Sequence, residues 1–562
     1  MEPIEKYHEW INKLPANSSM QQELKSIANN KEEITDRFFQ EIKFGTAGLR
    51  GIRGAGTNRM NYLTVARATQ GIADYILQSG QDSAKVVIAY DARHLSKEFA
   101  YIAAEIFAGN NINVNIFSSI RPTPELAFAV RELHCITGVC LTASHNPKEY
   151  NGYKVYWEDG AQISGDILNK IQEKIQARDF FDNFPQINFE QAIKIKKIQI
   201  IDEVIDKSYM KYVLSLSQQP DKSLDLTIPI VYTPLNGAGH KPMVNMAKQK
   251  GFVNFNVVPE QADPDPDFTT VPFPNPEFSQ SFALAEKYGA KFNAELLIAT
   301  DPDSDRMAIE VYDPQQKEYI ALNGNQTGAL LIYYLAMSKK EYGLLSKKEA
   351  MIKTIVTGDM GADICKSYGI HVFNTLTGFK NICGLIPKVQ KNGYHYFFGY
   401  EESIGCAPSD VIRDKDGIAA GLLIAEMAAF YRKKGKLLID ILEELYQKYG
   451  YYDEDIQSVM MPGKSGKEHI LRIMSYLRHE NLKTFGSFSV KRIIDFINGY
   501  KNIPKQNTLI FEMEDASWFA VRPSGSEPKI KFYYYVKTNS KKESSRKLSM
   551  LKKSVESVTR IK

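Results

Sequence analysis

Segments with strand-like and helix-like patterns alternate along most of this chain, and this alternation limits the possible folds more than any other feature of the sequence. Val86–Tyr90 and Val114–Phe117 are short apolar runs that predict buried strands. Val65–Leu77, Glu98–Ala108 and Thr123–Leu133 lie around them and predict helices. Strands that alternate with helices are typical of mixed layered structures, so the predicted fold class is α/β.

The same strand–loop–helix pattern recurs in two later blocks. Ile228–Tyr232 and Leu296–Ala299 predict strands of a second block, and the helix Gly324–Met337 with the strand Met351–Val356 begins a third. At 562 residues the chain is too long for one hydrophobic core, so we expect several domains.

The last segment has a different pattern. After a break around Tyr449–Asp453, Asp515–Arg522 and Ile530–Val536 predict strands. Polar and apolar side chains alternate around Ile530, which predicts a sheet with one face in solvent.

Composition excludes several classes of function. The net charge is only +4, from 70 basic and 66 acidic residues, so we expect neither nucleic acid nor a membrane as a partner. The richest apolar stretch, Ala329–Ala336, is shorter than the roughly 20 residues that a membrane span needs. The N-terminus lacks a signal-peptide core. The five cysteines show no Cys-x-x-Cys spacing, which favours reduced thiols and a cytoplasmic location.

A polar hexapeptide follows directly on the predicted strand Ile136–Leu141. It is Thr-Ala-Ser-His-Asn-Pro at residues 142–147. Ser144 should therefore lie at the carboxyl end of a strand, where open α/β sheets bind ligands. Its hydroxyl, next to His145 and followed by Lys154, is a candidate nucleophile or phosphate carrier. A polar loop that only caps the strand would have the same pattern.

Three aspartates, Asp301, Asp303 and Asp305, alternate along one loop. Carboxylates at this spacing can converge on one Mg²⁺. An EF-hand also begins with Asp-x-Asp-x-Asp, but Arg306 stands where its glycine belongs and Tyr312 where its glutamate belongs. The pattern therefore indicates a magnesium site, or else three solvated carboxylates that repel one another.

A third polar run lies near the end of the chain and suits a bound anion. It contains Arg522, Ser524, Gly525 and Ser526. The guanidinium offers a two-pronged donor, the hydroxyls donate, and glycine lets backbone N–H groups approach an oxygen. An ordinary turn would have a similar sequence.

Together these segments resemble the α-D-phosphohexomutases, the family of phosphoglucomutases and phosphomannomutases. The hexapeptide at 142–147 is similar to the active-serine loop of that family. Further matches follow in the order of the family: Asp-Pro-Asp-Ser-Asp-Arg at 301–306, Gly-Tyr-Glu-Glu-Ser-Ile-Gly at 399–405 and Arg-Pro-Ser-Gly-Ser-Glu-Pro at 522–528. With Gly-Thr-Ala-Gly-Leu-Arg-Gly at 45–51, the resemblance spans nearly the whole chain.

The resemblance implies four domains around a central cleft, namely three similar mixed α/β domains and a smaller C-terminal α+β domain. We expect domain I, with the phosphoserine loop, at residues 1–205 and domain II, with the metal loop, at 206–323. Domain III, with the sugar-recognition loop, should occupy 324–450, and the phosphate-binding domain 451–562.

The resemblance also implies a mechanism. Ser144 would be phosphorylated in the resting enzyme, give its phosphoryl group to a sugar monophosphate, and take the other phosphate back from the bisphosphate. The three aspartates and the phosphorylated Ser144 would hold Mg²⁺, with Arg306 beside the phosphoryl group. Lys154 is the expected general base, provided that neighbouring cations lower its pKa, and Arg50 and His145 are the next candidates.

Substrate recognition would fall to a second set of residues. Glu401 and Ser403 match the positions that hydrogen-bond the sugar hydroxyls, and Lys380 would be a second cation on the phosphate bound by the Arg522 loop. The Glu-Glu-Ser sequence here favours glucose over mannose. Tyr400 departs from the usual glycine and, with the chain length, is similar to the subgroup of phosphoglucomutase-2 and phosphopentomutase-like proteins.

The expected function is that of an isomerase, a phosphosugar mutase that interconverts α-D-glucose 1-phosphate and glucose 6-phosphate. Its cofactors would be Mg²⁺ and glucose 1,6-bisphosphate, as activator and intermediate, and its ligands sugar phosphates. A phosphomannomutase or phosphopentomutase of the same mechanism is the alternative. A phosphatase using the same serine and a non-catalytic sugar-phosphate sensor are more distant alternatives. We expect a monomer or a dimer.

Overall fold

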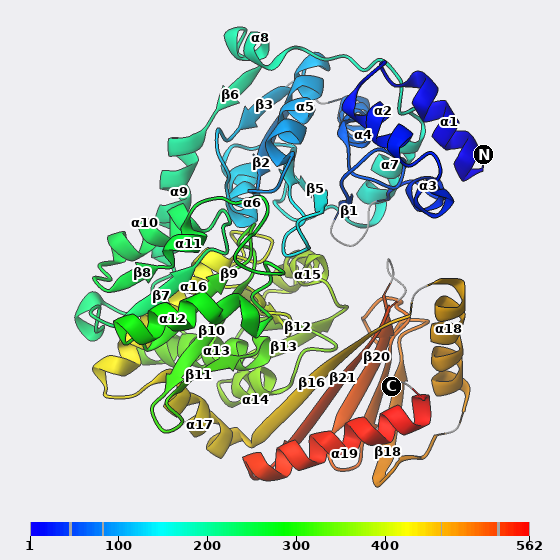
Figure 1. Ribbon diagram of the computed structural model, residues 1–562. Helices are drawn as coiled ribbons and strands as arrows, with labels where there is room; N and C mark the ends of the chain where they lie inside the picture. The colour runs from blue at the N-terminus through cyan, green and yellow to red at the C-terminus, as the bar shows by residue number, and fades with distance from the viewer. Residues whose placement is uncertain are drawn as a thin grey trace. The chain divides into compact units, whose positions relative to one another are not determined.

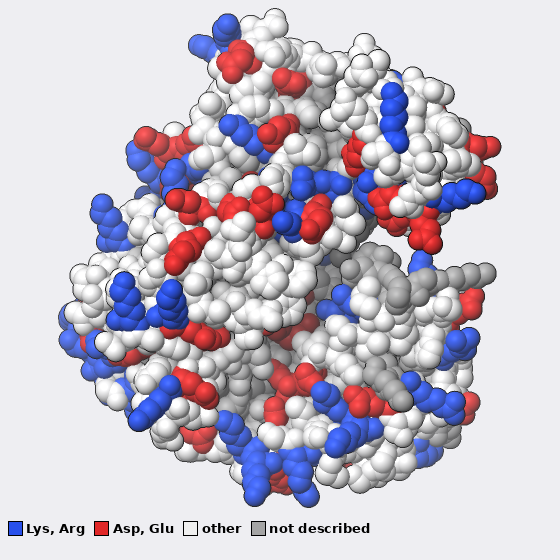
Figure 2. Space-filling model, viewed as in Figure 1, with Lys and Arg blue, Asp and Glu red and all other residues white. Residues whose placement is uncertain are grey.

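The computed structural model describes residues 2–43, 48–80, 84–461, 463–480, 482–524 and 529–560. The chain forms two compact units. The first comprises Met1–Asn323 and Ile404–Lys434, and the second comprises Gly324–Ser403 and Gly435–Lys562. Among the residues so described, every helix is too short or too polar to cross a lipid bilayer. Basic and acidic side chains are interspersed over the face seen in Figure 2, in keeping with the balanced composition.

The first sheet has the strand order β1-β5-β4-β2-β3-β6. The strands are β1 (Leu49–Ile52), β2 (Lys85–Tyr90), β3 (Asn113–Ile116), β4 (Thr137–Leu141), β5 (Tyr150–Trp157) and β6 (Ile198–Ile200). β2 is parallel to β3 and β4, whereas β5 is antiparallel to both β4 and β1. Because β2 and β4 are parallel, the loops that follow them meet at one edge of the sheet, and Ser144 lies in one of these loops.

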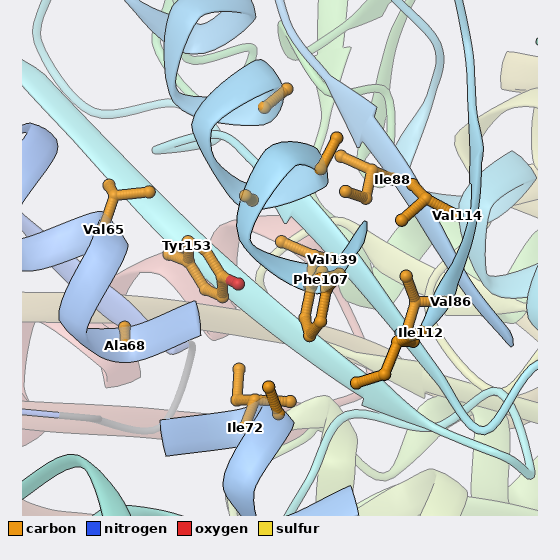
Figure 3. Packing of buried hydrophobic residues seen from close by; sticks show 14 of the residues in the cluster. Val65, Ala68, Ile72, Val86, Ile88, Phe107, Ile112, Val114, Val139 and Tyr153 are labelled. Carbon is orange, nitrogen blue, oxygen red and sulfur yellow. The ribbon is translucent and has the colours of Figure 1, made fainter. Parts of the chain in front are cut away.

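Helices cover this sheet and confirm the predicted alternation in the first block. They are α4 (Tyr62–Gln78), α5 (Ser96–Gly109), α6 (Thr123–Glu132), α7 (Gly165–Gln176) and α8 (Phe189–Lys194). Figure 3 shows how Val65, Ala68 and Ile72 of α4 and Phe107 of α5 pack with side chains from the sheet, among them Tyr153. This core fixes the strands whose ends carry the serine loop.

Three short helices precede this sheet and have a core of their own. They are α1 (Pro3–Lys13), α2 (Ser19–Ser26) and α3 (Lys31–Phe38). Trp10 and Phe38 pack edge to face at its centre, with ring centroids 5.6 Å apart. These helices therefore form a small core of their own ahead of the first sheet.

The second sheet of the first unit has the order β11-β10-β9-β7-β8. Its strands are β7 (Ile230–Thr233), β8 (Phe255–Val257), β9 (Leu296–Thr300), β10 (Met307–Asp313) and β11 (Glu318–Leu322). The associated helices are α9 (Asp202–Ser215), α10 (His240–Lys250), α11 (Pro259–Ala262), α12 (Ala283–Phe292) and, from the later segment, α16 (Gly417–Lys433), which follows β15 (Gly405–Ala407). β9 and β10 are antiparallel neighbours, and the aspartate loop joins them.

The second unit begins with parallel strands. β12 (Glu349–Thr354) pairs with both β13 (His371–Thr375) and β14 (His395–Glu401). Its helices are α13 (Gly324–Glu341), α14 (Met360–Ser367), α15 (Phe379–Lys391) and α17 (Leu438–Tyr449). The turn between β13 and α15 and the end of β14 carry the predicted substrate residues.

The C-terminal sheet is antiparallel, with the order β16-β21-β20-β19-β18-β17. Its strands are β16 (Tyr451–Met460), β17 (Thr484–Phe485), β18 (Phe488–Asp495), β19 (Leu509–Met513), β20 (Trp518–Pro523) and β21 (Lys529–Thr538). α19 (Lys541–Thr559) lies across one face, which also packs on α18 (Gly463–His479) (Figure 1). The four sheets confirm three mixed α/β domains and a C-terminal α+β domain.

The prediction of one solvated face on this last sheet is wrong at its centre. Tyr533 and Tyr535 of β21 point away from α19, yet both are buried, in a cluster with Ile355 and Leu376 of the preceding domain. The alternation of side chains is real, but the second face is covered by another domain rather than by water. A pattern within one strand carries no information about such a partner.

Candidate active site

Ser144 is held in an uncommon backbone conformation at the end of β4. Its φ is +52°, in the left-handed region, and its side chain is only 3% exposed. Its N–H donates to Oγ1 of Thr142 at 2.8 Å. The hydroxyl Oγ donates to Oδ2 of Asp301 at 2.6 Å and lies 3.2 Å from Nδ1 of His145. The serine and the first aspartate, predicted from separate motifs, are therefore in direct contact.

The three aspartates form one buried cluster. Oxygen atoms of Asp301, Asp303 and Asp305 lie within 4.8 Å of one another. Thr123, at the start of α6, donates its backbone N–H to the carbonyl of Asp303 at 2.9 Å and its hydroxyl to Oδ2 at 2.8 Å. The cluster is thus fixed to the domain that carries Ser144.

This cluster fits a divalent cation. Oδ1 of Asp303 and Oδ1 of Asp305 are buried without a hydrogen-bond partner among the described residues. Burial, followed by the charges of Asp303 and Asp305, raises the pKa of Asp301 well above its ordinary value. Three carboxylates, two of them with an oxygen that accepts no hydrogen bond within the described part of the chain, offer the hard oxygen donors that Mg²⁺ prefers, and the cation would remove their mutual repulsion.

Two lysines also contact the cluster. Nζ of Lys154 lies 2.6 Å from Oδ2 of Asp303 and 2.9 Å from Oδ2 of Asp305, and Nζ of Lys415 lies 3.2 Å from the latter atom. Burial would lower the pKa of Lys154, but the two aspartates raise it above its ordinary value. The lowered pKa that we expected for a general base is therefore not found. In this arrangement Lys154 carries a proton and is paired with the two aspartates.

The pKa of His145 is shifted in the opposite direction to that of Lys154. Burial lowers its pKa well below the ordinary value, and the nearby guanidinium groups of Arg306 and Arg50 lower it further. The imidazole is therefore neutral at neutral pH. Arg50, on β1, donates from Nη1 to Oδ1 of Asn146 in the same loop at 3.0 Å. The five predicted residues of this site, Ser144, His145, Lys154, Arg50 and Arg306, thus surround the aspartate cluster.

The predicted substrate residues of the second unit meet at one turn. Glu401, at the end of β14, accepts a hydrogen bond from the backbone N–H of Gly378 at 2.7 Å. Nη1 of Arg522, on β20, donates to Oγ1 of Thr377 at 2.7 Å, and Gln506 donates to the same hydroxyl at 3.3 Å. A carboxylate and a guanidinium from two domains are therefore fixed on adjacent residues.

Other predicted residues lie close in sequence to these. Lys380 is half-buried in the first turn of α15, and burial lowers its pKa. Ser403 is half-buried, and Ser524 donates its N–H to the carbonyl of Lys529 at 2.7 Å. Gly525 and Ser526 lie outside the described residues, as does part of the motif at 45–51.

The side chain of Tyr400 faces away from this turn. It is 1% exposed. A Cβ at Gly328 of α13 would fall 2.4 Å from its ring, and a Cβ at Gly361 of α14 would fall 2.5 Å from its hydroxyl. Neighbouring residues of a strand point to opposite faces, so Glu401 faces the substrate turn and Tyr400 faces the core. Tyr400 therefore packs in the core of the second unit, and its side chain does not face the turn that carries Glu401.

Sequence reasoning missed three residues of the first site: Arg93, Thr123 and Lys415. The position of Arg93 three residues after a predicted strand that neighbours the serine strand was a usable signal. Thr123 and Lys415 carry no local signal, because their partners lie 180 and 110 residues away in the chain.

Comparisons with known proteins were made for sequence and for structure. Three family models match the chain: the phosphoglucomutase/phosphomannomutase alpha/beta/alpha domains I, II and III, over residues 41–182, 207–313 and 323–449. A phosphoglucomutase of Staphylococcus haemolyticus is 34% identical over 508 residues, which cover 88% of this chain and 90% of that protein.

Two solved structures illustrate the likeness of fold. The open form of the Paramecium phosphoglucomutase pp63/parafusin has a TM-score of 0.72 at 18% identity, and the match covers 93% of this chain and 96% of that one. The N-acetylphosphoglucosamine mutase of Aspergillus fumigatus, solved with GlcNAc-6P and magnesium, has a TM-score of 0.52 at 13% identity, covering 97% and 100%.

Proposed function

This chain belongs to the phosphoglucomutase/phosphomannomutase family, and from that premise we propose that it interconverts α-D-glucose 1-phosphate and glucose 6-phosphate through a phosphoserine at Ser144. The observation that carries the proposal is the 2.6 Å hydrogen bond from the Ser144 hydroxyl to Asp301, inside a cluster of three buried carboxylates. A hydroxyl at that place would lie beside a cation held by these carboxylates, and such a cation would stabilise the phosphoryl oxygens. The relatives named phosphoglucomutase favour glucose as the sugar.

The reaction would consist of two transfers. Phosphoserine 144 gives its phosphoryl group to the free 6-hydroxyl of glucose 1-phosphate. That hydroxyl loses one proton and the serine oxygen gains one, so glucose 1,6-bisphosphate and free Ser144 are formed. Ser144 then takes the phosphoryl group from position 1, and glucose 6-phosphate is left. Both steps depend on positioning and on stabilising the charge of the phosphoryl oxygens rather than on new covalent chemistry.

Asp301, Asp303 and Asp305 would hold Mg²⁺, whose charge would stabilise the phosphoryl oxygens when it is bound. The magnesium in the Aspergillus mutase supports this assignment. Arg306, beside Asp305, and Arg50, beside the serine loop, would add positive charge near the phosphoryl group. Lys154 carries a proton that it can give to the serine oxygen when the phosphoryl group leaves, and it accepts a proton in the reverse step.

The second unit would bind the end of the substrate that does not react. Arg522 and Lys380 supply the cations for its phosphate, and Glu401 and Ser403 the hydrogen bonds for its sugar hydroxyls. Tyr400 is buried behind this turn, so the choice of glucose rests on the relatives named phosphoglucomutase and not on this residue. Sugar phosphates as ligands and a cytoplasmic location complete the proposal.

A direct test compares kcat/KM for glucose 1-phosphate, mannose 1-phosphate and ribose 1-phosphate with Mg²⁺ and bisphosphate present. We expect glucose to lead by at least about tenfold, which corresponds to about 1.4 kcal/mol of transition-state preference. A lead for another sugar would keep the mechanism but replace the substrate.

Two alanine variants test the phosphoserine. Ser144→Ala should abolish turnover and remove the phosphate that mass spectrometry finds on that peptide after incubation with glucose 1,6-bisphosphate. Ser118→Ala is the matched control, because Ser118 also donates its hydroxyl to an aspartate, Asp202, on the same domain. Full activity in Ser144→Ala would refute the mechanism.

A further inference from the structure

One guanidinium group holds most of the serine loop. Arg93 lies in the loop after β2 and is 3% exposed. Its Nη1 donates to the carbonyls of Pro147 at 2.8 Å and Tyr150 at 3.2 Å, and its Nη2 donates to the carbonyl of Ser144 at 2.6 Å and also to that of Asn146. Four backbone carbonyls within seven residues therefore converge on a single side chain.

Arg93 is itself fixed in place. Its Nε lies 3.3 Å from Oδ2 of Asp91, and both side chains are fully buried. Oδ1 of Asp91 accepts hydrogen bonds from the N–H of Arg93 at 3.0 Å and from the hydroxyl of Ser96 at 2.8 Å. The ring of Phe268 lies under the guanidinium, 5.1 Å from ring centroid to Cζ. The guanidinium thus has one orientation.

This orientation has a consequence for the reacting hydroxyl. Ser144 has a φ of +52°, which L-residues other than asparagine, aspartate and histidine rarely adopt. Such a conformation persists only where the surroundings hold it. The N–H of Ser144 is held by Thr142 and its carbonyl by Arg93, so the two peptide groups that flank the residue are both fixed. With them, the direction of Oγ toward Asp301 is fixed.

We propose that Arg93 is a positioning residue for phosphoryl transfer: by fastening the carbonyls of residues 144–150 it keeps the Ser144 oxygen aimed at the aspartate cluster. The inference rests on the proposed function, since it concerns the same serine. A lysine cannot replace this group, because one ammonium cannot reach four carbonyls from one plane. Arg93→Lys should therefore keep the buried charge but lose the geometry.

The chain offers a matched control in Arg67 of α4. Arg67 is 6% exposed, and its Nε donates to the carbonyls of Ile175 at 3.0 Å and Arg178 at 2.7 Å. It pairs with Glu41 at 2.8 Å and lies over the ring of Phe180 at 4.2 Å. Like Arg93, Arg67 is a buried arginine that donates to backbone carbonyls, pairs with a carboxylate and lies over an aromatic ring, but it holds a different segment of the chain.

The experiment compares Arg93→Lys with Arg67→Lys by melting temperature, kcat, KM and the rate at which the isolated phosphoenzyme transfers its phosphate to glucose 1-phosphate in a single turnover. Both variants should melt at a lower temperature. Arg93→Lys alone should reduce kcat and the single-turnover rate, by about 100-fold, the effect of a displacement near 1 Å. Its KM should stay within about threefold, because in the proposed function the residues that bind the substrate lie in the second unit.

Asp91→Asn is a second variant that keeps the shape of the loop. It should reduce the single-turnover rate by less than Arg93→Lys does, because the amide still accepts from Arg93 N–H but no longer pairs with the guanidinium charge. Wild-type single-turnover rates in either variant would overturn the inference and leave Arg93 a structural residue like Arg67. If the wild-type protein takes up no phosphate on Ser144 from glucose 1,6-bisphosphate, the proposed function fails, and the inference fails with it.

Discussion

Asp303 and Asp305 each retain a buried carboxylate oxygen that accepts no hydrogen bond from the described residues. A buried ionised oxygen without a partner is costly, and both side chains are already held on the other oxygen by Lys154. A cation at the unsatisfied oxygens is the simplest way to remove this cost. The two atoms therefore mark where a metal would bind.

Asp303→Asn should weaken Mg²⁺ binding and lower kcat by more than about 100-fold. Changing a residue that only hydrogen-bonds a metal ligand costs about 10- to 100-fold, and changing a ligand itself should cost more. The check is a titration of Mg²⁺ into protein stripped with EDTA, read by activity and by the rise in melting temperature that binding causes. Asp313→Asn is the control, because Asp313 is a buried aspartate at the end of β10 that holds a turn. A Mg²⁺-dependent rise in melting temperature as large in Asp303→Asn as in wild type would contradict the assignment.

Glu310 gives a stability prediction that depends on pH. Burial, followed by the neighbouring carboxylate of Glu286, raises the pKa of Glu310 to about 8. The folded protein therefore holds this proton more tightly than the unfolded chain. The stabilisation is fully present below the unfolded pKa of 4.5 and is lost as the pH rises toward about 8, by up to about 1.4 kcal/mol for each pH unit.

We expect Glu310→Gln, which cannot ionise, to melt at a higher temperature than wild type near pH 9 and at a similar temperature near pH 5. Glu318→Gln, at an exposed position of the neighbouring strand β11, is the control and should have the same effect at both pH values. The check is the melting temperature of each variant and of wild type, measured by differential scanning fluorimetry at the two pH values. An equal effect of Glu310→Gln at both would show that the pKa is not raised.

At the scale of elements, the substrate end of the site depends on a contact between a strand and a turn. β20 supplies Arg522, and the turn between β13 and α15 supplies Thr377 and Gly378, which anchor Arg522 and Glu401. The hydroxyl of Thr377 accepts from Arg522 and from Gln506 at once. One side chain therefore orients the cation that would bind the phosphate.

Thr377→Val keeps the shape of the side chain and removes this acceptor. Hydrogen bonds to charged groups contribute about 1.5–3 kcal/mol, so KM for glucose 1-phosphate should rise at least about tenfold. We expect kcat to change by less than threefold, since the reacting groups lie elsewhere. Thr375→Val, on β13, is the control, because its hydroxyl makes only a 3.5 Å contact, with the carbonyl of Asn381. A loss in kcat with KM unchanged would argue against the role of Thr377.

At the scale of the whole molecule, the first unit is built from two separate stretches of the chain. Residues 404–434 follow the sugar loop but pack with the first unit, where α16 contacts α9 and α10 and Lys415 reaches Asp305. In the second unit, Tyr535 and Tyr533 of β21 join the C-terminal sheet to Ile355 and Leu376. Each unit thus has its own cores, and we expect two calorimetric transitions.

Two core variants should separate these transitions. Tyr535→Ala leaves a cavity in the core that joins the two sheets of the second unit. It should lower the free energy of unfolding of that unit by about 3 kcal/mol or more, and with it the temperature of one transition. Tyr153→Ala, in the core under the first sheet, should lower the temperature of the other transition. Hydrogen exchange should show β12 and β21 losing protection together in Tyr535→Ala while β2 and β4 keep theirs. A single transition that moves with both variants would contradict the division into two units.

The sequence by itself determined the local features of this protein. The strands and helices of the first block, the serine turn after β4 and the triplet of aspartates follow from patterns a few residues long, because strand period, turn residues and ligand spacing are local properties. The five motifs in order also predicted the family, which the comparisons confirm.

Only the tertiary structure decided how distant residues meet. Ser144 and Asp301 are 157 residues apart in the chain, and Lys415 lies 110 residues from Asp305 in a segment without a local signal. The pKa of Lys154 follows the aspartates that pack against it, opposite to the expected direction, and the second face of β21 is buried because another domain covers it. Burial, charge and contact depend on which residues are neighbours in space, and only the folded chain determines those neighbours.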